Sequence, residues 1–171
     1  CPVWPKEFEA TYIPCEVQVL EGTRQQRIDK LNSFSDVPGL KVAVINYEAT
    51  WRIFEELQAW NPDMIIADES QRIKTHNAKQ SKAMHKLGKL AKYKLILTGT
   101  PVQNQPMDFF SQYKFLDESI FGTSYYAFRS TYAIMGGYGG HQVIGYNRLD
   151  ELIKKAHSIA FRVTKDEALD L

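Results

Sequence analysis

Two carboxylates stand side by side at Asp68 and Glu69, directly after the apolar run MIIA. One carboxylate of such a pair can hold Mg²⁺, directly or through water, while the other orients or deprotonates an attacking water. A solvated or helix-capping acidic pair is the alternative interpretation, and the dipeptide by itself favours it. The position after a predicted buried strand is what makes these two residues candidates for metal-assisted hydrolysis.

Two further polar clusters follow predicted strands. Thr98-Gly99-Thr100-Pro101 comes after the run LIL, about 30 residues beyond Asp68, and offers two hydroxyls around a flexible glycine. An ordinary strand-to-helix turn is the alternative for this cluster. Asn46-Tyr47-Glu48 comes after the run VAVI. Because ligands bind outside the carboxyl ends of parallel strands, the three clusters are predicted to meet along one edge of a sheet.

The stretch from Ser70 to Met107 contains no acidic residue, although the whole chain has a net charge of only +1. Such a local asymmetry suits binding to a phosphate backbone. A merely solvated surface is the alternative, because four lysines between positions 79 and 89 are predicted to share the face of a helix that lies opposite its apolar face. The basic residues of the stretch are Arg72, Lys74, Lys79, Lys82, Lys86, Lys89, Lys92 and Lys94.

The composition indicates one folded domain. Of 171 residues, 44% are hydrophobic and 24% are charged, which excludes a disordered tail or a collagen-like repeat. No apolar run approaches the roughly 20 residues of a membrane span. Two cysteines are too few for a disulfide framework, so we expect a reducing, intracellular location. The four histidines lack metal-ligand spacing, and the start at Cys1 rather than Met predicts a piece of a longer protein.

Short β-branched runs alternate with amphipathic segments, which predicts an α/β fold with a parallel sheet flanked by helices. The later strands are nearly continuous apolar runs, typical of a sheet covered on both faces. The segment from Gly136 to Gly145 is predicted to be a flexible loop. Strands are expected at 16–20, 41–46, 63–68 and 93–97, and helices at 23–34, 47–60, 77–92, 107–116, 125–132 and 148–160.

Residues 63–133 resemble the first RecA-like lobe of the Swi/Snf family, which are helicase-like, DNA-translocating ATPases of superfamily two. Two motifs carry the resemblance: DESQRIK, which starts at Asp68, and LTGTPVQN, which starts at Leu97. Their order and spacing are highly specific, and the likeness extends over at least residues 41–171. It implies a partial RecA-like lobe of the P-loop NTPase class over residues 1–116 and a helical extension toward a second lobe over residues 117–171.

The resemblance also implies roles for individual residues. Asp68 would coordinate the Mg²⁺ of bound ATP through water, and Glu69 would position and activate the hydrolytic water. Gln71, in the catalytic box, replaces the family's usual His; it can exchange hydrogen bonds but cannot become a cation. Thr98 and Thr100, the remaining cofactor-binding candidates, would couple the nucleotide state to the grip on double-stranded DNA. The candidates for contact with nucleic acid are Asn46, Tyr47, Lys74, Gln103 and Asn104.

Two parts of the family pattern do not occur in these 171 residues. One is the Gly-Lys-Ser/Thr loop that cradles the β- and γ-phosphates, and the other is the second RecA-like lobe with its arginine finger. We therefore expect the chain by itself to hydrolyse no ATP. The intact parent would be an ATP hydrolase that moves on double-stranded DNA as ATP closes the second lobe of the same chain over the first.

Two other functions stay open at the level of sequence. A non-enzymatic lobe that only binds DNA or a partner protein would carry the same motifs without turnover. A metal-dependent nuclease that uses Asp68 and Glu69 is less favoured, because Asn46 and Thr98 occupy the neighbouring strand ends where further carboxylates are usually needed.

Overall fold

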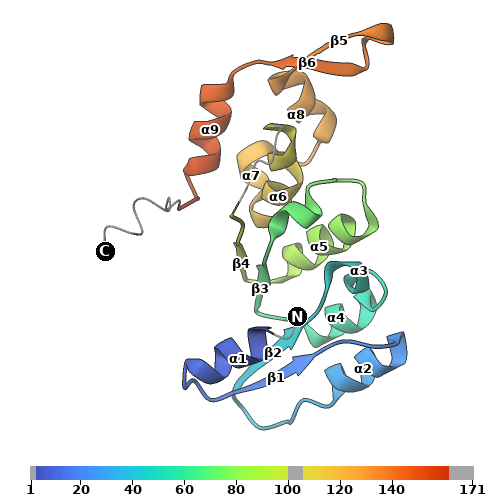
Figure 1. Cartoon of the computed structure of the whole chain (residues 1–171), viewed down its shortest axis with the longest axis vertical. Coiled ribbons are helices and arrows are strands. Elements are labelled where there is room, and N and C mark those ends of the chain that lie inside the picture. The colour runs from blue at the N-terminus through green and yellow to red at the C-terminus, as the bar shows by residue number, and fades with distance from the viewer. Residues whose placement is uncertain (1–2, 100–105, 162–171) are drawn as a thin grey trace.

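The computed structural model describes residues 3–99 and 106–161. Helices and strands alternate through the first hundred residues, and helices predominate afterwards, so the predicted α/β class is confirmed. Figure 1 shows the elements stacked along the long axis of the molecule, with the N-terminal strands toward one end and a hairpin at the other. No helix within the described ranges is long and apolar enough to cross a membrane.

The N-terminal part is built on a pair of parallel strands. Thr23 caps its second helix, since its hydroxyl accepts from the backbone N–H of Gln26 while the Gln26 side chain accepts from the backbone N–H of Thr23. This reciprocal cap satisfies two amide donors that a helix start leaves without partners. The elements are α1 (Val3–Ala10), β1 (Cys15–Val19), α2 (Arg24–Asn32) and β2 (Leu40–Val44), with β1 parallel to β2.

The middle part contains a second parallel pair, joined by a helix that covers one of its faces. Met84 of this helix packs against Ala67 of the sheet, and Leu87 packs with Leu20 and Leu57 in the neighbouring core cluster. The elements are α3 (Tyr47–Thr50), α4 (Phe54–Trp60), β3 (Met64–Ala67), the 3-10 helix η1 (Ser70–Ile73), α5 (Lys79–Leu90) and β4 (Tyr93–Ile96), with β3 parallel to β4.

The single helix predicted at 47–60 is in fact two helices, α3 and α4. The hydroxyl of Thr50 donates to the backbone carbonyl of Tyr47 at 2.7 Å, a side-chain bond that competes with continued helical bonding. Ile53 then takes a non-helical backbone conformation with φ −124° and ψ 37°, and its side chain is fully buried. The break therefore places Ile53 in the core.

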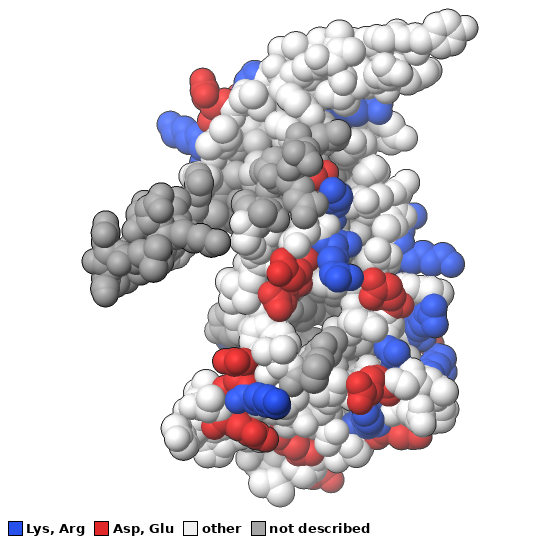
Figure 2. All heavy atoms as spheres, in the orientation of Figure 1, with Lys and Arg blue, Asp and Glu red and all other residues white. Residues whose placement is uncertain are grey.

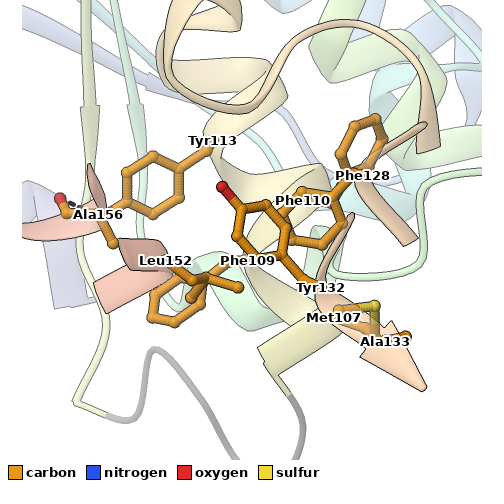
Figure 3. Packing of buried hydrophobic residues seen from close by; sticks show 9 residues of the cluster. All are labelled: Met107, Phe109, Phe110, Tyr113, Phe128, Tyr132, Ala133, Leu152 and Ala156. Carbon is orange, nitrogen blue, oxygen red and sulfur yellow. Dashed lines mark hydrogen bonds between the residues drawn. The ribbon is translucent and has the colours of Figure 1, made fainter. Parts of the chain in front are cut away.

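The C-terminal part packs around aromatic side chains. Figure 3 shows rings from α6 and α8 in one cluster with Leu152 of α9, and the hydroxyl of Tyr113 donates to the carbonyl of Ala156 at 2.8 Å. The elements are η2 (Pro106–Asp108), α6 (Phe109–Leu116), α7 (Glu118–Phe121), α8 (Tyr125–Tyr132), β5 (Ala133–Gly136), η3 (Tyr138–Gly140), β6 (Gln142–Tyr146) and α9 (Leu149–His157).

The glycine-rich segment predicted to be a flexible loop forms most of an antiparallel hairpin, in which β5 pairs with β6. Glycines leave room for isoleucines across the strands. A Cβ on Gly136 would lie 2.4 Å from Cδ1 of Ile144, and one on Gly145 would lie 3.3 Å from Cδ1 of Ile134. The loop prediction was wrong because these β-branched residues find a packing surface on the opposite strand.

The prediction that helices cover both faces of the sheet was wrong for β3 and β4. Met64 and Ile66 are 47% and 43% exposed, and Leu95 and Leu97 are 39% and 37% exposed. Since successive side chains of a strand point to opposite faces, these four residues share one open face. Among the described residues, the pairs β1–β2 and β3–β4 also form separate ladders rather than one continuous sheet.

Candidate functional site

The carboxyl ends of β3 and β4 lie next to each other, as predicted for the acidic and threonine clusters. The ladder continues past the strands, because the backbone N–H of Leu97 donates to the carbonyl of Ala67 at 2.9 Å and that of Ser70 donates to the carbonyl of Leu97 at 3.0 Å. This backbone pairing sets the turn that contains Asp68 and Glu69 beside the turn that contains Thr98.

Gln71 links the two turns through its side-chain amide. Its Nε2 donates to Oε2 of Glu69 at 2.6 Å, and its Oε1 accepts from the hydroxyl of Thr98 at 2.9 Å. The two bonds use the donor and the acceptor of one amide in opposite directions, which a neutral side chain with both groups allows. The structure therefore gives Gln71 a bridging position between the carboxylate box and the threonine turn.

The backbone at Glu69 is left-handed, with φ 49° and ψ 51°. This conformation costs a non-glycine residue about 1–2 kcal/mol. The backbone N–H of Glu69 donates to Oδ1 of Asp68 at 2.9 Å, which holds the two acidic residues in one turn. Both side chains are exposed at the end of β3. Strained backbone of this kind concentrates at functional sites, where surrounding contacts keep it in place.

Tyr47 brings the third predicted cluster to the same place. Its hydroxyl donates to the backbone carbonyl of Asp68 at 2.6 Å. Burial, together with the nearby Asp68 carboxylate, raises the pKa of the Tyr47 phenol well above its ordinary value, so it remains a donor. Asn46, in contrast, caps α3, since its Oδ1 accepts from the backbone N–H of Ala49 at 3.0 Å and from Nη1 of Arg27 at 3.3 Å.

Behind the carboxylates, a buried polar pair joins the box to α6. The hydroxyl of Ser70 donates to Oε1 of Gln112 at 2.6 Å, and both residues are at most 1% exposed. Nε2 of Gln112 donates to the carbonyl of Asp108 at 3.1 Å, and Lys74 pairs with the Asp108 carboxylate at 3.4 Å. Sequence reasoning missed Ser70, Gln112 and Asp108; the one available signal was a lone amide inside the aromatic run FFSQYKF.

The box has the ligand chemistry that Mg²⁺ requires. Asp68 and Glu69 present hard carboxylate oxygens at an exposed strand end. The described part of the chain contains no group of three or more His, Cys, Asp or Glu residues that could enclose a metal ion. Mg²⁺ usually keeps several waters and takes one or two carboxylates from the protein, and the Asp68–Glu69 pair offers two. The predicted site residues Thr100, Gln103 and Asn104 lie outside the described residues.

Six of the eight basic residues in the 70–107 stretch divide into two groups. Arg72, Lys74 and Lys89 form ion pairs with Glu48, Asp108 and Glu118, at 3.7, 3.4 and 3.1 Å. Lys79, Lys82 and Lys86 of α5 instead line an open groove. Figure 2 shows Lys and Arg side chains along the side of the molecule where α3 and α5 lie. The predicted four-lysine face is therefore reduced to three residues, because Lys89 is turned to α7.

Residues 1–168 match the family model of the SNF2-related domain, which is nearly the whole chain. The chain belongs to this SNF2-related family. The resemblance to Swi/Snf proteins that the two motifs carry is therefore confirmed.

Curated relatives of this SNF2-related chain include two kinds of DNA repair and recombination protein. A RAD54-like protein of Drosophila ananassae is 33% identical over 128 residues, covering 71% of this chain and 16% of the relative. A RAD54B protein of Gallus gallus is 28% identical over 120 residues, covering 70% of this chain and 12% of the relative. The SNF2-related chain thus spans a small part of the length of these relatives.

The fold of the SNF2-related chain matches a solved structure over nearly its whole length. The Sulfolobus solfataricus SWI2/SNF2 ATPase core, solved in complex with dsDNA, covers 98% of this chain with a TM-score of 0.67 and 23% sequence identity, and the match takes up 32% of that chain. The predicted architecture, part of a RecA-like lobe, is thereby confirmed at the level of the fold.

Proposed function

We propose that this chain is part of the first motor lobe of an ATP-hydrolysing translocase that moves on double-stranded DNA. The observation that carries the proposal is the chain of hydrogen bonds from Glu69 through Gln71 to Thr98. It places an acidic pair and a hydroxyl-bearing turn at one strand edge, where a parallel α/β sheet binds its ligand.

In this proposal Asp68 and Glu69 divide the chemistry between them. Asp68 holds the Mg²⁺ of ATP through water, and Glu69 orients and activates the water that attacks the γ-phosphate. When bound, Mg²⁺ would neutralise the negative charge that develops on the phosphate oxygens. Gln71 donates one hydrogen bond to the Glu69 carboxylate and accepts another from Thr98, so a shift of Thr98 would move Glu69. Thr98 and Thr100 would then carry the nucleotide state toward the DNA.

The proposed DNA contacts of the box region require some side chains to exchange partners. Lys74 pairs with Asp108, and the Asn46 side chain caps α3. Lys74 would leave Asp108 for a phosphate when DNA binds, while Tyr47 stays on the carbonyl of Asp68 and links the DNA side to the box. Gln103 and Asn104 complete this set. The relatives named for DNA repair and the neighbour solved with dsDNA support DNA as the partner.

The proposal implies further parts that belong to a longer protein. A phosphate loop and a second RecA-like lobe of the same chain would complete the nucleotide site, and the protein would act inside the cell. The chain by itself is expected to release no phosphate from ATP. A non-enzymatic lobe that only binds DNA or a protein remains the competing proposal.

The deciding experiment is phosphate release by the full-length protein with Mg²⁺, with and without duplex DNA. The expected result is DNA-stimulated hydrolysis that Glu69→Gln reduces by orders of magnitude while DNA binding persists. Glu9→Gln, a change of an exposed carboxylate in α1, serves as the matched control and should leave the rate unchanged. Full-length protein that binds DNA but shows no Glu69-dependent turnover would favour the non-enzymatic lobe.

A further inference from the structure

A basic groove lies between α2, α4, α5 and the segment that joins α3 to α4, which sequence reasoning did not bring together. It has a volume of about 410 Å³ and is open to solvent. Arg24 comes from the start of α2, Trp51 and Arg52 from the segment between α3 and α4, and three lysines from α5. We call this surface the α5 groove. Its basic residues are Arg24, Arg52, Lys79, Lys82 and Lys86, and Glu55 and Glu56 are the acids that line it.

The acids neutralise only part of this charge. Arg24 donates to the Glu56 carboxylate and to the carbonyl of Arg52. Its charge is therefore already paired, and it links α2 to α4 across the groove. None of the carboxylates in the described part of the chain lies within ion-pair distance of Lys79, Lys82 or Lys86. The groove therefore presents a row of cations whose mutual repulsion an anionic partner would relieve.

Aromatic rings fix the positions of two of these lysines. Nζ of Lys79 lies 4.5 Å from the ring centroid of Trp51, and Cζ of Arg52 lies 5.2 Å from the same ring. Nζ of Lys86 lies 5.6 Å from the centroid of Phe54. Cation–π contacts of this kind are worth about 0.5–1 kcal/mol at exposed sites. The ammonium groups are thus partly ordered before a ligand arrives, which lowers the entropic cost of binding.

The spacing of the lysines matches a phosphate backbone. Lys79, Lys82 and Lys86 lie on successive turns of α5, and seven residues of helix rise about 10 Å. Phosphates along one strand of B-DNA advance by about 3.4 Å each, so the row extends over about three phosphates.

We propose that the α5 groove is an auxiliary binding site for the backbone of duplex DNA, separate from the contacts that the motifs supply. The proposal rests on the proposed function for the identity of the partner. Because its side chains offer charge and no base-reading geometry, the groove binds without sequence preference. It would anchor DNA along the flank of the lobe while the box region changes its grip during turnover.

The test compares two triple variants of the full-length protein by fluorescence anisotropy with a short duplex at several salt concentrations. Lys79→Gln/Lys82→Gln/Lys86→Gln removes the groove cations. Lys89→Gln/Lys92→Gln/Lys154→Gln removes the same charge from exposed positions outside the groove. The groove variant should bind more weakly, and its slope of log K against log salt should fall by about 0.9 for each phosphate that the protein no longer neutralises. The control should keep nearly the wild-type slope.

A second variant separates ring positioning from charge. Trp51→Leu keeps every cation, so it should weaken binding less than the triple change and leave the salt slope unaltered. Equal affinity and slope for the groove variant and its control would overturn the auxiliary site while leaving the proposed function intact. Failure of the wild-type protein to bind any duplex would instead contradict the proposed function. Tighter binding of poly-glutamate than of duplex, abolished in the groove variant, would assign the groove to an acidic protein and overturn the proposal.

Discussion

The hydroxyl of Ser70 and Oε1 of Gln112 lie 2.6 Å apart in the interior, although 42 residues separate them in the chain. Ser70 directly follows Glu69, and Gln112 lies in α6. The pair therefore ties the left-handed turn of the carboxylate box to a helix that follows the threonine turn in sequence. Because both side chains are buried, neither can replace the other with water at low cost.

Replacement of one partner of this pair should cost more than replacement of both. Gln112→Leu leaves the Ser70 hydroxyl without its amide partner, and Ser70→Ala does the converse, so each should lower the free energy of unfolding by about 1–3 kcal/mol. The double variant should cost less than the sum of the two single changes, as expected for residues in contact. Urea unfolding of the four proteins measures this coupling, and strict additivity would show that the bond contributes nothing.

The bridging position of Gln71 predicts a loss of turnover rather than of binding. Gln71→Ala removes the bonds to both Glu69 and Thr98, and we expect kcat for DNA-stimulated hydrolysis to fall by about tenfold, with KM little changed. Gln58→Ala, at an exposed position of α4, is the control. The measurement is steady-state phosphate release, and a variant with wild-type kcat would remove Gln71 from the coupling path.

Histidine in place of Gln71 should keep the link between Glu69 and Thr98 but make it depend on pH. The native amide has no proton to gain between pH 5 and 8, whereas imidazole titrates in that range. Gln71→His should therefore add a new inflection to the pH profile of kcat between about pH 6 and 7. Superimposable profiles of the two proteins would contradict this prediction.

Buried His85 should make the fold less stable in acid. Burial lowers the pKa of His85 to about 4, and its Nε2 lies 2.9 Å from the carbonyl of Ser111. Well above about pH 6.5 the ring is neutral in both the folded and the unfolded chain, so its contribution to stability is complete. As the pH falls from about 6.5 toward 4, only the unfolded chain gains the proton, and stability is lost. His85→Gln cannot titrate and should flatten this part of a stability curve measured by urea unfolding.

Gly88 gives a prediction in which packing opposes helix propensity. Alanine is favoured over glycine in a helix by about 1 kcal/mol. A Cβ on Gly88 would, however, lie 2.8 Å from Cδ2 of Phe115 and 3.1 Å from the Phe115 carbonyl oxygen. Gly88→Ala should therefore destabilise the protein by about 1–3 kcal/mol through overpacking. A Cβ on Gly39 would meet no atom within 4 Å, so Gly39→Ala should be neutral or slightly stabilising. Thermal melts of the two variants and the wild-type protein measure both effects.

The sequence pattern predicts the strands and the meeting of their ends well. The expected strands at 63–68 and 93–97 correspond to β3 and β4, and the bonds from Tyr47 to Asp68 and from Thr98 to Gln71 join the three clusters. This succeeds because short apolar, β-branched runs favour strands and the ends of parallel strands meet at one edge. The assignment of chemical roles to these residues stays a prediction.

Features that depend on contacts between distant segments are not visible in local patterns. The bridge made by Gln71 depends on a side-chain rotamer, and the pair of Ser70 with Gln112 depends on how α6 packs. The α5 groove needs Trp51 next to Lys79, which only the break between α3 and α4 brings about. The same holds for the hairpin. In the sequence Gly136 resembles a loop residue, and only its contact with Ile144 on the opposite strand shows why a glycine is needed there.

The open face of β3 and β4 has a practical consequence for anyone who purifies this chain. Met64 and Ile66 of β3, Leu95 of β4 and Leu97 just after it are partly exposed hydrophobic side chains on neighbouring strands. Surfaces of this kind promote self-association and aggregation of a soluble protein. Recombinant material at high concentration should therefore bind hydrophobic dyes and precipitate, and arginine or mild detergent in the buffer should keep it in solution.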